Sequence, residues 1–467
     1  MPGRSDAFLI DRMPVSKPHS IEAGEQSMRI AIIAPEQIPV PPVLGGSVEI
    51  TVLAIAKQLA ARHDVTIVSR AHPRYPKRET LPSGVRVERV PAGSPSRYLA
   101  GVLRLLAGRQ YDVIEIDNRP KFVRPIKRMF PRATVSLFLH SLTFVSKPYA
   151  SKSAARDSLR AADLVIANSR SLKRTLAKRF PESAAKLRIV WLGVDTARFA
   201  PAGEDERRDG RAFRLLFAGR LIPRKGLPVL LKAIKIARAK SGRRLRLIVA
   251  GGAQRKGYAA KMRRLARKLG VRAQFLGTVP HRRIHRVFRD ADAFVCPSQK
   301  HEAFGLVNVE AMASGLPVIA SGIGGIGEIV KDGQNGYLIR DYRRPRAFAD
   351  AIVKLAGDPA RLREMRRRAR HDCLQRFTWA ATANRLGRLY GSPHLSAEEL
   401  AELADSDSED GAEASLSASA DMRMSVGVHA VERIGESEVP SADVNAEADA
   451  GAISVTFHPS NEIPADD

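Results

Sequence analysis

Cysteine, aromatic residues and long apolar runs are all scarce in this chain of 467 residues. Its two cysteines, Cys296 and Cys373, leave no disulfide framework, so a reducing compartment is expected. No run of eighteen apolar residues occurs, so no membrane-spanning helix is expected, and residues 1–27 lack the apolar segment of a secretory signal. Aromatic residues make up only 6% of the chain and are not interleaved with a basic patch, which disfavours nucleic acid as a ligand.

Positive charge, in contrast, is abundant and unevenly distributed. The formal net charge is +28, but residues 391–467 hold 18 acidic and 2 basic side chains, so residues 1–390 alone carry a net charge of +44. A body this basic favours an anionic partner, such as a nucleic acid, an anionic membrane surface or a phosphorylated substrate. Arginines on solvated helix faces explain the same count without any partner.

Short apolar runs alternate with helical patterns, as in parallel sheets that helices cover on both faces. In the first half the expected strands are 29–34, 65–69, 85–90, 113–116, 134–139 and 163–168. Expected helices begin at Ser47, a candidate N-cap, and after Ser169. The pattern then restarts, with strands at 214–218, 245–250, 273–276, 293–296 and 317–320, a helix at 345–375 and a last helix at 377–391. The predicted fold class is α/β, with two doubly wound, Rossmann-like domains facing across a cleft.

The same pattern divides the chain into segments. Residues 28–200 form the predicted N-terminal domain and residues 201–376 the predicted C-terminal domain, with the last helix, 377–391, packing back on the first domain. Residues 1–27 are polar, and residues 392–467 are rich in Ala, Ser, Asp and Glu, so both extensions are predicted to be disordered. Met28 directly precedes the first strand and is a candidate start residue.

The stretch 294–330 carries the clearest chemical signal. A strand, a polar loop, a helix and a second strand form one parallel crossover unit, and ligands bind at the carboxyl ends of such strands. Glu302 lies in the loop and Glu310 two helical turns later, while Gly305 precedes a helix whose free amides suit an anion. A hydrolase carboxylate pair is one interpretation, but the spacing along a loop and a helix fits two ends of one elongated ligand better.

Three further positions lie where a ligand is expected. Gly45 and Gly46 occupy a strand-to-helix loop, although a bare turn explains any Gly-Gly pair equally. His140 follows a strand directly, where it can hydrogen-bond a substrate or serve as a structural histidine. Asp290 and Asp292 spell the D-x-D of metal sites, yet they precede a strand, so a structural role is expected and no metal ion is predicted.

Several motifs together resemble the GT-B fold glycosyltransferases of family 4, which are retaining enzymes that use nucleotide sugars. They are GRL-x2-RKG at 219–226, SQKHEAFGLVNVEAMASGLPVIAS at 298–321, GGIGEIV at 324–330, WLGVDTARF at 191–199 and IANS at 166–169. The resemblance covers residues 28–390. Ala303, where the family often has Gly or Pro, and Gly327, where Pro is frequent, depart from the family pattern.

The resemblance implies a donor site for a UDP- or GDP-sugar. Arg220 and Lys225 match the family's diphosphate-binding pair, and such cations would stabilise the leaving group as its charge develops. Glu310 matches the residue that accepts both ribose hydroxyls, a task that suits a carboxylate.

The remaining implied contacts surround the sugar and the base. Glu302 matches the glutamate beside the donor sugar, and His140 matches the histidine that contacts that sugar. Backbone groups complete the implied site, at Phe304, Gly305 and Leu306 for the sugar, Val279 for the base, and Gly45 and Gly46 for the phosphate and the acceptor.

The predicted function is transfer of a hexose from a nucleotide sugar to a lipid-linked or polysaccharide acceptor in cell-surface glycan synthesis. The expected location is cytoplasmic, and peripheral on the inner face of the membrane. Basic side chains are the candidate membrane contacts, at Lys121, Arg124, Lys127, Arg128, Arg170, Lys173 and Arg174. A soluble synthase with a small acceptor, a catalytically inactive binding protein and a basic nucleic-acid-binding protein are the alternatives.

Overall fold

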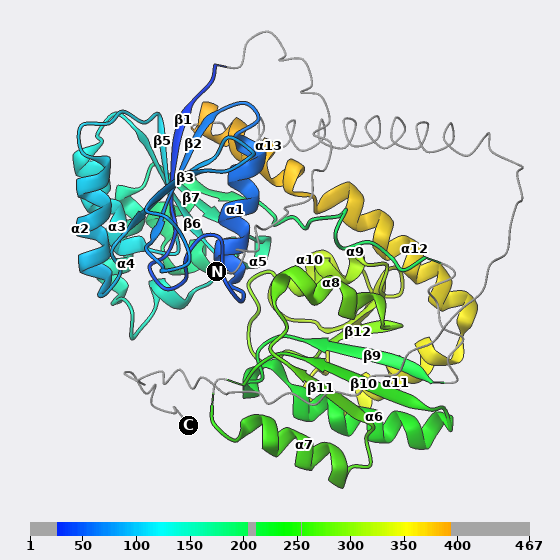
Figure 1. The fold of residues 1–467 in the computed structure, drawn as a ribbon. Helices are drawn as coiled ribbons and strands as arrows, with labels where there is room; N and C mark the ends of the chain where they lie inside the picture. Colours follow the sequence, from blue (N-terminus) through cyan, green and yellow to red (C-terminus); the bar gives the residue numbers. More distant parts are fainter. Residues whose placement is uncertain (1–25, 204–211, 254, 394–467) are drawn as a thin grey trace, which may run out of the picture. The chain divides into compact units, whose positions relative to one another are not determined.

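The computed structural model describes residues 26–203, 212–253 and 255–393 (Figure 1). All of these residues belong to one compact unit. The predicted disorder of residues 1–27 and 392–467 falls almost wholly outside the described residues. The division into domains at residues 200 and 376 stays a prediction, but two separate sheets are present.

The first sheet is parallel except at one edge. In the described part of the chain its order is β3 (Arg78–Thr80), β4 (Arg86–Val90), β2 (Asp64–Arg70), β1 (Arg29–Ile33), β5 (Val113–Asp117), β6 (Thr134–Leu139), β7 (Leu164–Ala167) and β8 (Leu187–Ile189). The antiparallel strand β3 was not predicted, because the short polar sequence RET has no apolar alternation.

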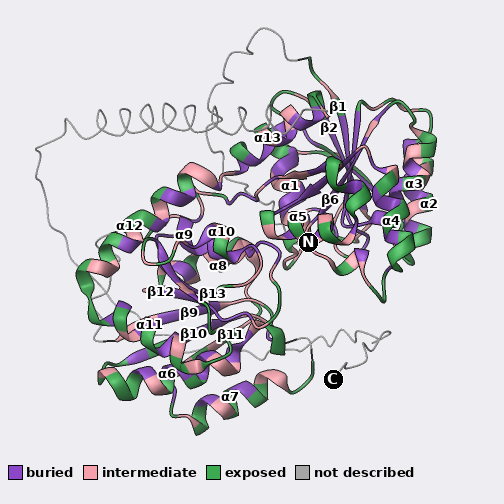
Figure 2. Ribbon diagram, turned by 180° about the vertical axis from the view of Figure 1, so that it is seen from behind, coloured by how far each residue is buried: buried purple, intermediate pink, exposed green. Residues whose placement is uncertain are grey.

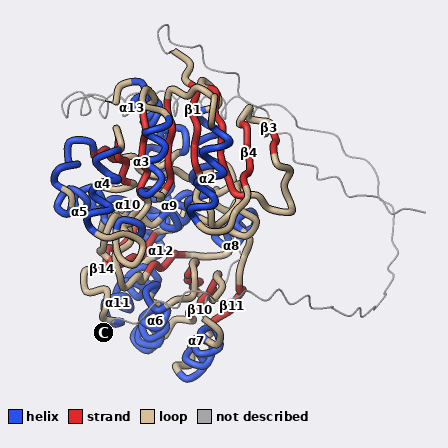
Figure 3. The backbone as a smooth tube through the Cα atoms, turned by 90° about the vertical axis from the view of Figure 1, so that its left-hand side faces the viewer, coloured by secondary structure: helices blue, strands red, loops and turns tan. Residues whose placement is uncertain are grey.

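Helices cover both faces of this sheet, because side chains alternate along each strand. Ile30 and Ile32 pack in one core with α1 (Ser47–Leu59), while Ala31 and Ile33 pack in another. The helices of the second core are α2 (Pro95–Leu106), α3 (Pro120–Met129), α4 (Lys152–Ala161) and α5 (Arg170–Arg179). Figure 3 shows α2 and α3 in front of the strands, and Figure 2 shows the buried strands inside.

The second sheet is parallel throughout its described strands. Its order is β11 (Ala273–Gly277), β10 (Leu245–Ala250), β9 (Phe213–Ala218), β12 (Ala293–Cys296), β13 (Val318–Ser321) and β14 (Gly336–Ile339). The associated helices are α6 (Leu227–Ser241), α7 (Tyr258–Lys268), α8 (His281–Arg289), α9 (Leu306–Ala313), α10 (Ile326–Ile329), α11 (Pro345–Gly357) and α12 (Pro359–Arg376).

The last helix returns to the first sheet. After α12, helix α13 (Trp379–Gly391) packs against α1, and Thr378 bridges to Val194. The Tyr390 hydroxyl donates to the Glu115 carboxylate inside the first sheet. A buried polar bond of this kind anchors the helix, because leaving either group unpaired there would be costly.

Two local predictions were wrong. Gly46, not Ser47, is the N-cap of α1, and no side chain caps that helix. The helix expected at 345–375 is two helices, divided at Asp358, whose carboxylate accepts the Arg361 amide as the N-cap of α12. An aspartate followed by Pro359 is the usual start signal of a helix, so the sequence did contain the break.

No helix in the described residues is both long enough and apolar enough to cross a membrane.

Candidate functional site

Each sheet reverses its strand order once, and several of the predicted site residues follow the strands at these two reversals. In the first sheet the reversal lies between β1 and β5, and in the second between β9 and β12. Crevices form there because the connections leave the neighbouring strands in opposite directions. The Gly45 loop follows β1, Lys225 follows β9, and Glu302 follows β12.

Lys225 and Glu302 are in direct contact. The Lys225 Nζ lies 2.6 Å from Glu302 Oε2, and Ser298 Oγ donates to the same oxygen at 3.2 Å. Both charged side chains are partly exposed, 18% and 24% respectively, so a ligand can reach them. The pair holds a cation and a carboxylate side by side at the end of adjacent strands.

Arg220 adds a second cation to this strand end. Its side chain is exposed, and it follows Gly219 directly after β9. The pKa of its guanidinium is lowered, first by desolvation and next by the charge of Arg224, whereas Glu302 acts in the opposite direction. Two cations near one carboxylate leave a net positive charge, which suits a diphosphate.

The N-terminus of α9 presents backbone amides beside Glu302. Gly305 is its N-cap in the left-handed region, with φ 97°, and Leu306 is the first helical residue. The Phe304 side chain is buried and packs edge-on against Phe377, with ring centroids 6.0 Å apart. The Phe304 side chain is therefore occupied by packing, which leaves its backbone for the predicted ligand contact.

Glu310 lies one helix turn deeper and is held by a neighbour that the sequence did not identify. Its Oε1 lies 3.0 Å from His281 Nε2, and Arg198 Nη2 lies 3.3 Å from His281 Nδ1. Because arginine can only donate, Nδ1 accepts and Nε2 donates to the carboxylate. Arg198 thus selects the imidazole tautomer that supports Glu310, and Asp195 lies 3.6 Å from Arg198.

His140 is fixed at the end of β6 by several contacts. Its backbone amide donates to Asn118 Oδ1 at 2.9 Å, and its carbonyl accepts from Asn168 Nδ2 at 3.2 Å. The Phe138 ring stacks on the imidazole at 4.4 Å, and Asp117 Oδ1 lies 2.7 Å from Nε2. Asn118 has a φ of 52°, in the left-handed region that asparagine adopts more readily than most residues other than glycine.

The imidazole of His140 is held in its neutral form. Burial lowers its pKa to about 4, although the charges of Glu115 and Glu49 partly offset that effect. Burial also raises the pKa of Asp117 well above its usual range, and burial followed by the charge of Asp117 does the same for Glu115. The Nε2–Oδ1 hydrogen bond to Asp117 and the Phe138 ring together hold the neutral imidazole in one orientation.

The remaining predicted residues lie in loops near these groups. No atom lies within 4 Å of a side chain built at Gly45, whereas one built at Gly46 would meet the Glu49 carboxylate at 2.4 Å. Val279 lies between β11 and α8 and is partly buried. The His281 amide donates to the Leu44 carbonyl at 3.3 Å, so the loop after β1 touches the start of α8.

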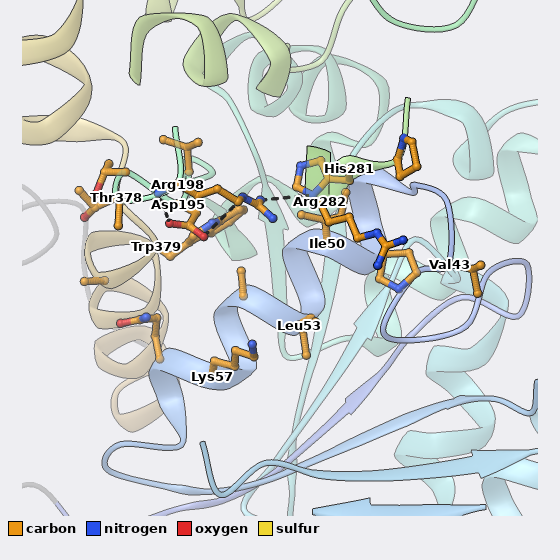
Figure 4. Close-up of a pocket in the computed structure, with 18 residues that line it drawn as sticks. Val43, Ile50, Leu53, Lys57, Asp195, Arg198, His281, Arg282, Thr378 and Trp379 are labelled. Atoms are coloured by element: carbon orange, nitrogen blue, oxygen red, sulfur yellow. Dashed lines mark hydrogen bonds and ion pairs between the residues drawn. The ribbon is translucent and has the colours of Figure 1, made fainter. Parts of the chain in front are cut away.

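A cavity of about 540 Å³ is lined in part by His281, the residue that contacts Glu310 (Figure 4). Its wall is formed by α1, the connection after β8, and the starts of α8 and α13. Apolar side chains such as Leu53 and Trp379 line it together with Lys57, Arg198 and Arg282, against the single carboxylate of Asp195. The cavity is therefore electropositive, with an apolar floor.

The D-x-D residues have the predicted structural role. Asp292 accepts from the Arg214 amide at 2.8 Å and from Arg366 Nη2 at 3.1 Å, and Asp290 ends α8. Within the described ranges, no group of three or more His, Cys, Asp and Glu side chains is arranged to hold a metal ion. Cys296 and Cys373 are both buried.

The fold has close counterparts among solved structures. Sucrose-phosphate synthase from Thermosynechococcus elongatus matches with a TM-score of 0.66 and 24% identity over 78% of this chain and 98% of that one. Anabaena HepE in complex with UDP-glucose matches at 0.62 and 22%, covering 78% and 100%. WaaG, a glycosyltransferase involved in lipopolysaccharide biosynthesis, matches at 0.61 and 17%, covering 78% and 100%. These likenesses define the class: the fold is GT-B, as predicted.

Sequence comparisons give the family. The model for Glycosyltransferase Family 4 matches residues 45–198, and that for Glycosyl transferases group 1 matches residues 203–372. YtcC of Bacillus subtilis (strain 168) is 31% identical over 381 residues, which are 78% of this chain and 92% of YtcC. Spore coat protein SA of the same strain is 28% identical over 378 residues, or 78% and 99%. The chain belongs to glycosyltransferase family 4 and is a glycosyltransferase.

The sequence did not reveal the neighbouring residues that hold the predicted site residues His140 and Glu310 in place. Asp117 is the last residue of β5 and Asn118 follows it, and a polar pair at a strand end was a usable signal. His281 gave no signal, because its partner Glu310 lies 29 residues away on another element.

Proposed function

We propose that this glycosyltransferase is a retaining enzyme that takes a hexose from a UDP- or GDP-sugar. The observation that carries the proposal is the Lys225–Glu302 pair at 2.6 Å, where the strand order reverses and beside the free amides of α9. A diphosphate needs cations and amides, and a sugar needs a hydrogen-bonding carboxylate. The UDP and UDP-glucose complexes of the structural neighbour HepE support a nucleotide-sugar donor.

Each residue then has a task in the transfer. Arg220 and Lys225 bind the diphosphate and stabilise the charge that develops as the bond to the sugar breaks. Glu310, aligned by His281, accepts the ribose hydroxyls, and Val279 lies at the base. Glu302 and the neutral His140 position the hexose. We expect no metal ion in the reaction.

The Gly45 and Gly46 loop is the proposed place where the acceptor meets the donor. Open space surrounds the Cα of Gly45, and Gly46 is the N-cap of α1, so the loop has room and free helix-end amides for an oxygen of the phosphate or of the acceptor. The acceptor itself is proposed to be a lipid-linked or polysaccharide glycan at the inner membrane face. The lipopolysaccharide role of the neighbour WaaG and the net charge of +44 over residues 1–390 support this.

A donor screen tests the proposal. The full-length protein is incubated with UDP- and GDP-hexoses in the absence of an acceptor. The rate of donor hydrolysis and the Kd of each donor are measured. One base and one hexose should be preferred, and no turnover or binding of any donor would contradict the proposal.

The acceptor is tested separately, by adding membrane lipid extracts in one arm and free sugars or sugar phosphates in the other. The hexose of the donor carries a label. Incorporation of this label into lipid supports the proposal, whereas transfer of the label only to a small sugar indicates a soluble synthase. Binding to vesicles with and without anionic lipid checks the location.

A further inference from the structure

The carboxylate of Glu328, on α10 beside the second sheet, reaches the N-terminus of α5 beside the first. The Arg170 amide donates to Glu328 Oε2 and the Ser171 amide to Oε1, both at 2.8 Å. These are the first two amides of α5, and they have no acceptor inside their own helix. The third, from Leu172, donates to Ser169 Oγ at 2.9 Å. Glu328 therefore completes a cap that Ser169 begins.

A third donor, Trp191, binds this carboxylate, and two cations pack against the Trp191 ring. The Trp191 indole N–H donates to Glu328 Oε2 at 3.0 Å. The guanidinium groups of Arg170 and Arg376 lie 5.2 and 4.9 Å from the Trp191 ring centroid, and Arg376 Nη2 donates to the Glu328 carbonyl at 3.1 Å. Charge-assisted hydrogen bonds in such surroundings are among the strong ones, and the helix dipole adds to them.

The segment that carries Glu328 also supports the backbone of Glu302. The Gly325 amide donates to the Glu302 carbonyl at 2.9 Å. A side chain at Gly324, where φ is 60°, would lie 1.9 Å from that carbonyl oxygen. Only glycine permits this approach, so the backbone at 324–325 and the Glu302 loop move together.

The same segment is packed between the Glu302 loop and α5. A side chain at Gly325 would meet the Ala303 carbonyl oxygen at 2.2 Å on one side and Ser169 Cβ at 2.9 Å on the other. Ser171 Oγ also lies 3.4 Å from Nε2 of His301, the residue before Glu302. The N-terminus of α5, residues 324–328 and the Glu302 loop therefore form one packed unit.

We propose that Glu328 is a positioning residue for the transfer reaction. It touches no reacting atom. By capping α5 it fixes segment 324–328 between the two halves of the molecule, and so fixes the backbone from which Glu302 meets Lys225. The catalytic consequence rests on the proposed function, whereas the cap itself does not.

Hydrogen exchange tests the cap without any assay of activity. In the full-length Glu328→Ala protein, the amides of Arg170 and Ser171 should exchange about tenfold faster or more, because their acceptor is gone. The control is Glu364→Ala, which removes an exposed carboxylate 3.7 Å from Arg361 on α12 and should leave these amides unchanged. Unchanged exchange at Arg170 and Ser171 in Glu328→Ala would overturn the proposal.

Kinetics test the positioning. Glu328→Ala should lower kcat about tenfold or more while the Kd for UDP changes less than about twofold, because the nucleotide ligands remain. Glu328→Gln, which keeps one acceptor oxygen, should recover part of the lost kcat, and Trp191→Phe should lose less than Glu328→Ala.

A role in stability alone predicts a lower Tm with normal kcat per folded molecule, and a direct role in donor binding predicts a weaker Kd. Either result would overturn the proposal. If the wild-type protein transfers no sugar, the proposed function fails, and hydrogen exchange still decides the cap.

Discussion

Gly226 offers a direct test of how backbone packing shapes the proposed donor site. It precedes α6 in the left-handed region, with φ 74°, next to Lys225. A side chain there would lie 1.8 Å from the Pro297 carbonyl oxygen, whereas ordinary contact needs 3.4 Å. The adjacent loops are also joined by the Gln299 amide, which donates to the Arg224 carbonyl at 2.7 Å. In Gly226→Ala the loops after β9 and β12 must therefore separate by about 1.6 Å.

The expected cost has two parts. A left-handed alanine costs about 1 kcal/mol, and forcing apart packed backbone costs about 1–3 kcal/mol more. The matched control is Gly242→Ala at the other end of α6, because its φ is 63° and no atom lies within 4 Å of the added side chain. The control should lose only the stability that a left-handed alanine costs. At about 2 °C per kcal/mol, the Tm of Gly226→Ala should lie roughly 2–6 °C below that of the control.

The effect on activity should be larger than the effect on stability. A displacement on the order of 1 Å in a positioned cation can cost about 100-fold in rate, so turnover of Gly226→Ala should fall by about that factor while Gly242→Ala stays near wild type. Thermal melts and donor turnover of purified proteins measure both. Equal Tm values for the two variants, or normal turnover in Gly226→Ala, would refute the reasoning from backbone contact.

Three further predictions concern the diphosphate and ribose contacts, the buried Glu49, and the absence of a metal requirement. Lys225→Ala should lower turnover about 100-fold with a modest change in UDP affinity, whereas Glu310→Ala should chiefly weaken UDP binding; calorimetry and initial rates separate the two, and the reverse pattern would contradict the assignments. Burial raises the pKa of Glu49 to about 7 from 4.5, so the folded state keeps a proton that the unfolded state has lost. Relative to Glu49→Gln, the free energy of unfolding of the wild type should fall by about 3 kcal/mol as pH rises from 4.5 to 7. If the urea midpoints of the two proteins differ by the same amount at pH 5 and at pH 8, this prediction is wrong. Incubation with EDTA should leave turnover intact, and loss restored by manganese would show that a metal is needed.

Much of the fold could be predicted because its determinants are local. Apolar runs of four to six residues mark buried parallel strands, and Gly315, with φ 70°, directly follows the C-cap of α9. Ser169 is the N-cap of α5, as predicted. Prediction failed where the local signal was weak or shared, as at β3, whose three residues are polar, and at Gly46 and Ser47, either of which can begin a helix.

The site shows the same division. The sequence pattern identified Glu302 and Glu310 as candidates and the family resemblance added Lys225, and the family assignment agrees with the motifs that carry them. The spacing could not show that His281 holds Glu310, or that Glu328 caps α5, since those pairs are 29 and at least 157 residues apart. Contacts at such separations depend on how whole elements pack.

By itself, the sequence determined the α/β class, the two-sheet GT-B architecture and the glycosyltransferase family, because apolar period, glycine positions and motif order are properties of the chain. Stretch 294–330 alone indicated a strand-end site for an anion and hydroxyls. Only the tertiary structure decided how that stretch is held. Burial keeps His140 neutral, Arg198 sets the His281 tautomer, and Glu328 joins α5 to the Glu302 loop. Burial and through-space contact have no counterpart in residue order, which is why these supports had to be seen in three dimensions.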